Sequence, residues 1–217
     1  MKKRTLVTIA ACLCAASTQA SVAAVLDFNN LGLAGGGLIP QTYGDEAGIL
    51  DVSYRSLAGV GNAPEQSESL RFWSSNLTYS GLVNVAYAGA VNAVGEITFT
   101  PAPGYMLTLD SLELGSYAGT ARNSVVTVFT GDYTQVLFST NTLSIGPTAV
   151  TVTPGVSSVG PIHLQFGPEA YNVAIDNVRY FAEVAPPVHT PIPAPALLLA
   201  SSLLGIAGLA RRKTRAE

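Results

Sequence analysis

The side chains with the most evident chemistry in this chain are oxygen ligands of the kind that Ca²⁺ binds. Calcium takes about six to eight oxygens from carboxylates, amides and backbone carbonyls. The candidate ligands are Asp27, Asn29, Asp45 and Asp176, with Glu46 as a further donor beside Asp45. The alternative is that Asp176 accepts hydrogen bonds from backbone N–H groups in a turn and that Asp45 and Glu46 form a solvated pair. The sequence thus suggests calcium as the one cofactor, provided that the fold brings these residues together.

A second candidate site rests on Trp73, the only tryptophan of the chain. A sugar ring stacks on an exposed aromatic side chain, and polar groups beside that side chain bind its hydroxyls. Phe72 precedes Trp73, and neighbours in a strand face opposite sides, so one of the two points into the core and the other outward. We therefore predict a carbohydrate site at Trp73, with Tyr43 contributed by a loop. The alternative places Trp73 in the core.

No catalytic pattern accompanies these residues. The two histidines are His163, in a predicted strand, and His189, near the C-terminus, and neither has a nucleophile motif to serve as base. The chain lacks Gly-x-Ser-x-Gly, His-Glu-x-x-His and a phosphate-binding loop with lysine. A glycosidase needs only two carboxylates, but nothing in the sequence marks such a pair. We predict that the protein is not an enzyme.

The charge of the central region excludes one class of partner. Seven of the eleven basic residues lie in the two terminal segments, and residues 21–186 keep four arginines and no lysine against thirteen acids, a net charge of −9. Nucleic-acid binding needs a basic surface, so we predict no nucleic-acid partner. Both cysteines, Cys12 and Cys14, lie in the N-terminal segment. Residues 21–186 therefore contain neither disulfides nor thiolate metal ligands.

The elements that must position these side chains are β-strands. Short runs rich in β-branched and aromatic residues alternate with clusters of Gly, Pro, Asn and Ser, and helical periodicity is absent. In residues 106–114 the alternation changes phase near Asp110 and Ser111, which predicts a β-bulge there. Residues 29–42 are rich in glycine and predict a loop, either a plain surface loop or one folded around a ligand. The predicted strands are 23–28, 49–54, 69–73, 82–88, 95–100, 106–114, 124–130, 135–139, 149–153, 162–166 and 173–181. The predicted fold class is all-β, an antiparallel jelly-roll β-sandwich.

Several phrases in this region support that fold by resemblance. Leu26-Asp27-Phe28, Gly95–Gly104, Leu107–Gly115 and Tyr171–Tyr180 resemble segments of jelly-roll sandwiches and, more distantly, of galactose-binding-like domains and carbohydrate-binding modules. The last strand of such domains commonly reads Ile-Asp-Asn-Val, as it does here at Asp176. The resemblance implies that the first and last strands run side by side. Asp27 and Asp176 are then expected to approach each other.

The two ends of the chain are typical of an exported and sorted protein. Basic residues at positions 2–4, an apolar run and small residues ending at Ala20 or Ala24 predict a signal peptide. Near the other end, prolines precede an uncharged apolar run, Ala194–Ala210, and a basic cluster follows it. That run is just long enough for a transmembrane helix, and the basic cluster predicts a cytoplasmic C-terminus.

This C-terminal layout resembles the PEP-CTERM sorting signal of Gram-negative bacteria, which an exosortase is thought to process. Ile192 stands where the usual motif has glutamate. The residues that carry the resemblance are Pro191, Pro193, Arg211, Arg212 and Lys213. The predicted domains are a signal peptide (1–20), a β-sandwich ectodomain (21–186), a proline-rich linker (187–195) and a transmembrane helix with a basic tail (195–217).

Together these patterns predict a secreted, non-catalytic protein of the cell surface or extracellular matrix that binds carbohydrate, with calcium as a structural ion. The resemblance implies an exosortase-type enzyme and the secretion machinery as partners, membrane attachment through the C-terminal helix, and exopolysaccharide as the ligand. The alternative is a structural matrix or biofilm protein that associates with copies of itself and has no glycan ligand.

Overall fold

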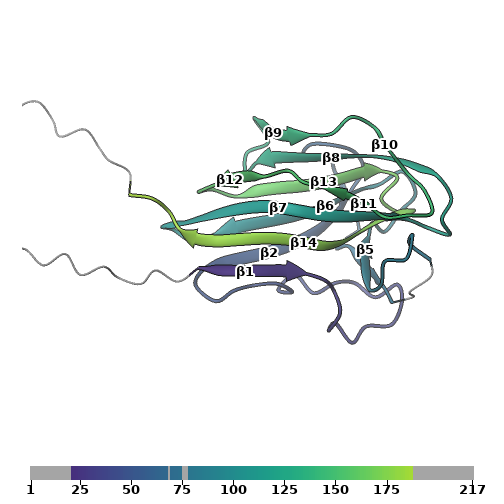
Figure 1. Ribbon diagram of the computed structural model, residues 1–217, viewed down its shortest axis with the longest axis horizontal. Helices are drawn as coiled ribbons and strands as arrows, with labels where there is room; N and C mark the ends of the chain where they lie inside the picture. The colour runs from purple at the N-terminus through teal and green to yellow at the C-terminus, as the bar shows by residue number, and fades with distance from the viewer. Residues whose placement is uncertain (1–20, 68, 75–77, 188–217) are drawn as a thin grey trace, which may run out of the picture. The chain divides into compact units, whose positions relative to one another are not determined.

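The computed structural model describes residues 21–67, 69–74 and 78–187, which form a sandwich of two antiparallel β-sheets (Figure 1). The chain divides after Ala185 into two compact units, and every strand belongs to the first. Across the described residues there is no helix long and apolar enough to cross a membrane. The all-β prediction is therefore confirmed for this part of the chain.

Several predictions concern residues outside the described part. These are the signal peptide (1–20), His189, the sorting motif with Pro191, Pro193, Arg211, Arg212 and Lys213, and the transmembrane helix (195–217).

The first sheet has β14 near its centre. Its strand order is β11-β7-β14-β5-β4, with β12 also paired to β7 and β1 also paired to β14. The strands of this sheet, called sheet A, are β1 (Val22–Leu26), β4 (Arg71–Trp73), β5 (Val85–Tyr87), β7 (Tyr105–Ser116), β11 (Val150–Val152), β12 (Val156–Ser158) and β14 (Val173–Val184).

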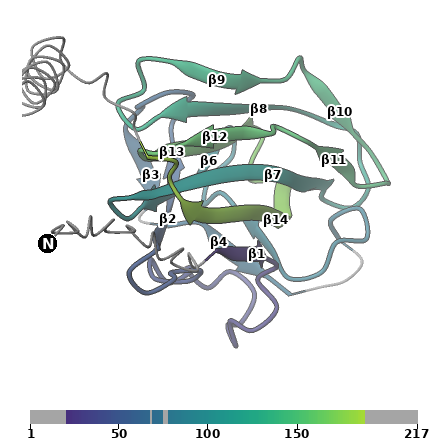
Figure 2. The same cartoon turned by 60° about the vertical axis from the view of Figure 1, so that its left-hand side comes forward.

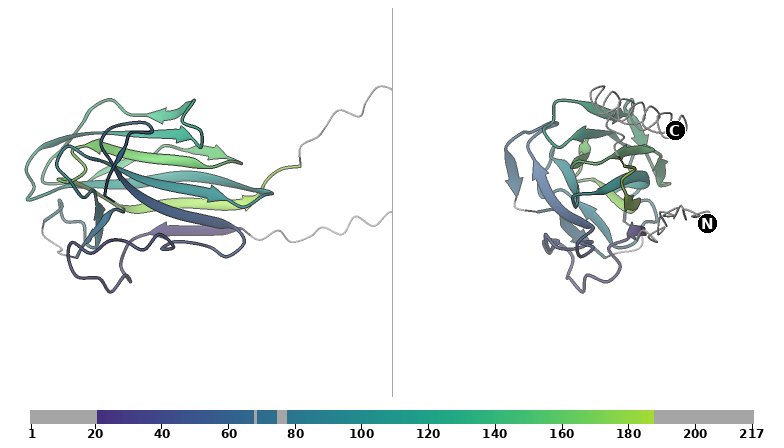
Figure 3. Two further views of the ribbon diagram at one scale, coloured as in Figure 1. Left: turned by 180° about the vertical axis from the view of Figure 1, so that it is seen from behind. Right: turned by 90° about the vertical axis from the view of Figure 1, so that its left-hand side faces the viewer.

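The second sheet packs against the first, as the turned views show (Figures 2 and 3). Its strand order is β10-β8-β13-β6-β2-β3, with β9 also paired to β8. The strands of this sheet, called sheet B, are β2 (Leu50–Leu57), β3 (Glu65–Ser67), β6 (Val94–Pro101), β8 (Arg122–Thr130), β9 (Val136–Ser139), β10 (Leu143–Ile145) and β13 (Ile162–Pro168).

Each of the eleven segments predicted as strands overlaps an observed strand. The sequence failed to predict β3, β10 and β12, which have three residues each. So short a segment is too brief for an alternating pattern to be recognised.

The predicted phase change in β7 is present. Leu107 and Leu109 are buried in the core, and so are Leu112 and Leu114, so the inward face switches at the two residues between these pairs. The partner strand β14 shows register shifts at the same level, between Asp176 and Tyr180. The switch lets one long strand keep apolar residues inward along its whole length.

The first and last strands lie side by side, because Leu26 of β1 pairs with Val178 of β14 and Val22 pairs with Ala182. The beginning of β14 instead neighbours β5, where Ile175 pairs with Ala86. In Figure 1, β1 begins and β14 ends at the left, whereas β5 lies toward the right. The described chain therefore enters and leaves at one end of the sandwich, and β4 and β5 lie toward the other.

A smaller apolar cluster lies on the outer face of sheet A, opposite the main core. It contains Tyr79, Leu82, Val85, Tyr87 and Ala174, with Trp73 packed against it. The loop between β4 and β5 crosses β7 here, and the backbone of Tyr79 contacts Gly115. A Cβ atom at Gly115 would collide with the Tyr79 carbonyl oxygen.

We predict that Gly115→Ala destabilises the protein by about 1–3 kcal/mol, since the added methyl group would force the loop backbone off the sheet. Gly146→Ala is the matched control, because nothing lies within 4 Å of a Cβ atom at that position. Urea unfolding of both variants checks the prediction. Equal unfolding midpoints for both variants would contradict it.

Candidate functional site

Trp73 lies on the outer face of sheet A. It follows Phe72 in β4, and Phe72 is buried in the main core with 3% of its surface exposed. Trp73 faces the other way and is half-buried, packed against the smaller apolar cluster. The predicted division of these two neighbours, one inward and one outward, is what the structure shows.

Tyrosines surround the Trp73 indole. Trp73 stands edge-to-face against Tyr87 (centroids 6.4 Å apart, 83° between planes) and against Tyr117 (6.5 Å, 82°). Tyr79 contacts both of these tyrosines, with its ring centroid 6.2 Å from that of Tyr87 and 5.4 Å from that of Tyr117. Tyr171 packs edge-to-face against Tyr87, with ring centroids 5.9 Å apart. Four of these five pairs are edge-to-face, and the Tyr79–Tyr87 pair is tilted at 31°. Such contacts favour a fixed orientation for each ring.

These rings enclose a pocket of about 150 Å³, which we call the aromatic pocket; its lining residues are Trp73, Tyr79, Tyr87, Tyr117, Tyr171 and Asn172. Tyr117 and Tyr171 are each 39% exposed and stand at its rim, whereas Tyr79 and Tyr87 are buried. Among the described residues, the buried Nε1 of Trp73 has no hydrogen-bond partner. The pocket thus combines apolar ring surfaces with phenol and amide groups that can donate and accept hydrogen bonds.

The glycine-rich loop supports one side of the pocket. Gly36 N donates to Phe72 O (2.7 Å), and Phe72 N donates to Gly37 O (2.8 Å), so the loop runs along β4 as an added strand would. Gly35 lies against the indole, where a Cβ atom would be 3.4 Å from Trp73 Cε3. The loop predicted for residues 29–42 therefore packs on the tryptophan.

Tyr43, the other residue predicted for sugar binding, lies elsewhere. Its ring stacks on Phe28 (5.6 Å, 27°), and its hydroxyl donates to Asp27 Oδ1 (3.5 Å). Burial and the neighbouring Asp27 raise the pKa of Tyr43 to about 12. The structure thus joins Trp73 to four other tyrosines. The sequence did not indicate that these four tyrosines meet Trp73 at one point.

The candidate calcium ligands form hydrogen bonds with protein groups. Asp27 Oδ1 accepts from Asn29 N (3.1 Å), and Asn29 Oδ1 accepts from Asn84 Nδ2 (2.7 Å). Asp45 Oδ1 accepts from Val52 N (2.7 Å), at the start of sheet B. Within the described ranges no group of three or more His, Cys, Asp or Glu side chains is placed to hold a metal. Asp27, Asp45 and Asp176 therefore do not form such a group.

Asp176 nevertheless has unusual surroundings. It is 4% exposed and pairs across the sheet with Glu113, a residue that the sequence did not single out. Its Oδ1 accepts from Asn177 N (2.7 Å), and Asn177 Nδ2 donates to Glu113 Oε2 (2.8 Å). Burial raises the pKa of Asp176 to about 8, and the charges of Glu113 and Asp27 add to this. Asp27 follows β1, which is paired with β14, and it adds to this rise as a like charge.

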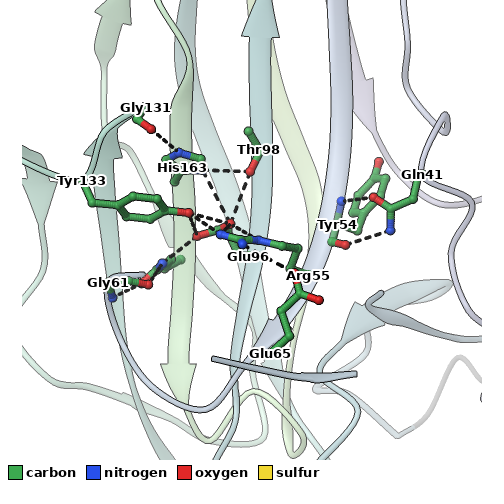
Figure 4. A network of polar contacts seen from close by, with 11 residues as sticks. Gln41, Tyr54, Arg55, Gly61, Glu65, Glu96, Thr98, Gly131, Tyr133 and His163 are labelled. Atoms are coloured by element: carbon green, nitrogen blue, oxygen red, sulfur yellow. Dashed lines mark hydrogen bonds and ion pairs between the residues drawn. The ribbon is translucent and has the colours of Figure 1, made fainter. Parts of the chain in front are cut away.

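A second buried carboxylate, Glu96 in β6, lies at the centre of a network on the outer face of sheet B (Figure 4). Arg55 donates to Glu96 Oε1 through Nε (2.9 Å) and Nη2 (2.7 Å). Gln165 Nε2 donates to Oε2 (2.6 Å), and the Tyr133 hydroxyl also donates to Oε2 (2.9 Å). Burial alone would raise the pKa of Glu96, but bonds from His163, Gln165 and Arg55 lower it to about 2.

This network fastens two loops to the sheet. Gln165 exchanges two hydrogen bonds with the backbone of Gly61, each 2.8 Å long. Tyr133 stacks on His163 with centroids 4.1 Å apart and 8° between the planes. His163 Nε2 donates to Gly131 O (3.1 Å), and Nδ1 lies 2.8 Å from Thr98 Oγ1. Because these groups are satisfied by each other, we assign the network a structural role.

Comparisons with known proteins show only distant likenesses. No protein-family model matches the chain, and no curated protein sequence matches it significantly. A CBM4 protein has 10% identity and a TM-score of 0.30, covering 68% of this chain and 96% of its own. The family 11 carbohydrate-binding module of cellulase Lic26A-Cel5E from Clostridium thermocellum has 10% identity and a TM-score of 0.26, covering 79% and 99%. The insecticidal crystal protein Cry2Aa has 10% identity and a TM-score of 0.27, covering 68% and 22%. At these scores the likenesses say nothing about what the present pocket binds.

We predict that Asp176→Asn stabilises the protein at pH 8. Between about pH 4 and pH 8 the folded protein holds a proton on Asp176 that the unfolded chain has released, so the free energy of unfolding falls as the pH rises. Asn cannot ionise, so the variant avoids this loss. Its free energy of unfolding should exceed that of wild type by about 2–4 kcal/mol at pH 8 and by almost nothing at pH 4. Denaturant unfolding at both pH values measures it.

The exposed Asp51 supplies the control, since Asp51→Asn should change stability by less than about 0.5 kcal/mol. A variant at Asp176 that is less stable than wild type at pH 8 would refute the prediction. The calcium hypothesis requires instead that Asp176 be ionised, because a metal binds the carboxylate and not the protonated acid. Calorimetric titration of the wild type with calcium at pH 8 tests it.

We predict that Glu96→Gln destabilises the protein by about 2–4 kcal/mol at pH 7, because Arg55 and Gln165 lose an anionic acceptor in a buried site. The stabilisation by Glu96 is present above its ordinary pKa and is lost as the pH falls toward 2. The difference between variant and wild type should therefore shrink at pH 3. Glu65→Gln is the control, because Glu65 is the exposed partner of Arg55 at 3.5 Å. Equal losses in the two variants would show that burial of the pair is unimportant.

Proposed function

We propose that residues 21–186 form a non-catalytic carbohydrate-binding module that holds one sugar ring in the aromatic pocket. The observation that carries this proposal is the convergence of Trp73 and four tyrosines, from separate parts of the chain, on one pocket with Asn172 at its wall. In a soluble domain, a partly exposed group of aromatic rings on the outer face of a sheet is the kind of surface that binds a ligand.

The size and chemistry of the pocket favour a sugar. Its volume of about 150 Å³ is below the range of about 300–1,000 Å³ that is usual for drug-sized ligands, so it fits a single ring rather than an extended chain. The C–H face of a pyranose packs on the aromatic walls. Its hydroxyls would meet the Asn172 amide and the phenols at the rim, which both donate and accept hydrogen bonds.

The proposal includes the location predicted from the sequence. We infer that the protein is exported, held by its C-terminal segment and processed by an exosortase-type enzyme, and that its ligand belongs to an exopolysaccharide. The alternation of consecutive strands β6, β7 and β8 between the two sheets supports the predicted jelly-roll form of the sandwich.

The alternative function, self-association in a matrix, has one observation in its favour. Val25 of β1 and Phe181 of β14 are 39% and 45% exposed on neighbouring strands of sheet A. These side chains form a small apolar surface near the end where the described chain enters and leaves. Association through this surface would depend on protein concentration and not on a glycan.

We predict that the purified wild-type protein binds a subset of a glycan array and that Trp73→Ala lowers this binding at least tenfold, because truncation removes the main stacking surface. Phe181→Ala is the control, since Phe181 lies outside the pocket. A loss with Phe181→Ala but not with Trp73→Ala would reject the pocket. Concentration-dependent association in sedimentation, without any glycan bound, would favour the alternative function.

A further inference from the structure

Arg71 lies beside the aromatic pocket on the same face of sheet A. It is two residues before Trp73 in β4, so both side chains point outward, and it pairs directly with Tyr87 of β5. Arg71 Nη1 donates to Gly36 O (2.8 Å). A Cβ atom at Gly36 would also lie 3.9 Å from the Tyr87 hydroxyl. Gly36 of the glycine-rich loop therefore lies next to both the Arg71 guanidinium and the hydroxyl of Tyr87, which lines the pocket.

Among the described residues, Arg71 has no carboxylate partner for its charge. Of the four arginines, Arg55 pairs with Glu96 and Glu65, and Arg122 pairs with Glu169. Arg71 forms no ion pair with the acidic side chains of the described residues, although the domain carries thirteen acids. Arg179 also has no ion pair with a described residue, but it lies farther along β14, opposite Val25 of β1. Within the part of the chain that the structure describes, Arg71 is therefore the cation beside the pocket that has no ion pair.

The chemistry of a guanidinium indicates which group of a ligand Arg71 would bind. Arginine presents its N–H donors in a planar fork that matches a carboxylate, and it stays charged at any physiological pH. The hydrogen bond to Gly36 O fixes one nitrogen and leaves the other donors for a ligand. A neutral hydroxyl matches these paired donors poorly, because it has a single oxygen and no negative charge.

We propose that the aromatic pocket binds an acidic sugar, with the ring between the aromatic side chains and its carboxylate on Arg71. This inference rests on the proposed function and narrows its ligand to a uronic acid or another carboxylated sugar of an anionic polysaccharide. The net charge of −9 opposes such a polymer at long range, but salt screens that repulsion beyond about 8 Å at physiological ionic strength. Attraction must therefore come from the local contact.

The test is a glycan array in which each uronic-acid oligosaccharide is printed beside its carboxyl-reduced, neutral counterpart. The wild-type full-length protein should bind the acidic form at least tenfold more tightly. In Arg71→Gln this ratio should fall toward one, and in Arg71→Lys it should stay intermediate, because lysine keeps the charge without the fork. Arg179→Gln should keep the wild-type ratio. Thermal unfolding of each variant checks that it is folded.

The outcomes distinguish failure of the acidic-sugar inference from failure of the proposed carbohydrate-binding function. Equal binding of acidic and neutral forms by wild type would overturn the acidic ligand and leave the carbohydrate module standing. Binding of neither form, with Trp73→Ala the same as wild type, would overturn both. An acidic preference that survives Arg71→Gln but is lost in Arg179→Gln would move the anion site to the other end of β14. The wild-type comparison needs no variant, so the test holds even if Arg71→Gln fails to fold.

Discussion

The pairing of β14 with β7 on one side and with both β1 and β5 on the other is the constraint on which the rest of sheet A depends. The alternation of its side chains sends Val173 and Ile175 into the main core and leaves Ala174 on the outer face. The small size of Ala174 leaves room for the Tyr79 loop and the aromatic rings above the sheet. Two residues later, Asp176 lies on this outer face beside Glu113. One strand therefore supports both the pocket and the acidic pair.

The two buried carboxylates show how surroundings decide the state of the same chemical group. Glu96 is fully buried, yet it stays ionised because Arg55, Gln165 and Tyr133 all donate to it. Asp176 accepts from Asn177 N and, at 3.4 Å, from Asn177 Nδ2, but it has no cationic donor and two carboxylate neighbours, so its pKa is raised to about 8. Burial opposes the charge in both cases, and the number of donors decides the outcome. The buried carboxylate of sheet B, Glu96, is thus ionised at neutral pH, whereas that of sheet A, Asp176, changes its charge near pH 8.

Much of the fold could be predicted because it follows from local alternation. The phase change in β7 and the opposite directions of Phe72 and Trp73 need only a period of two. The pocket could not be predicted, since Tyr79, Tyr117 and Tyr171 meet Trp73 through strand pairings between distant parts of the chain. Tyr43 looked equivalent in sequence, but its neighbour Phe28 lies in the main core. Glu96 gave no signal either, because its partners lie on other strands or in a loop.

The position of the pocket relative to the chain ends has a mechanical consequence. Tyr171 and Asn172 line the pocket just before β14 begins, and the described chain leaves soon after β14 ends at Val184. A pull between a bound polymer and the chain beyond Val184 would therefore run along β14, over roughly 40 Å of strand. Hydrogen bonds to β7 and β1 lie across that direction and would be loaded together in shear instead of opening one after another. The strand that builds the pocket would also be the one best placed to bear tension on it.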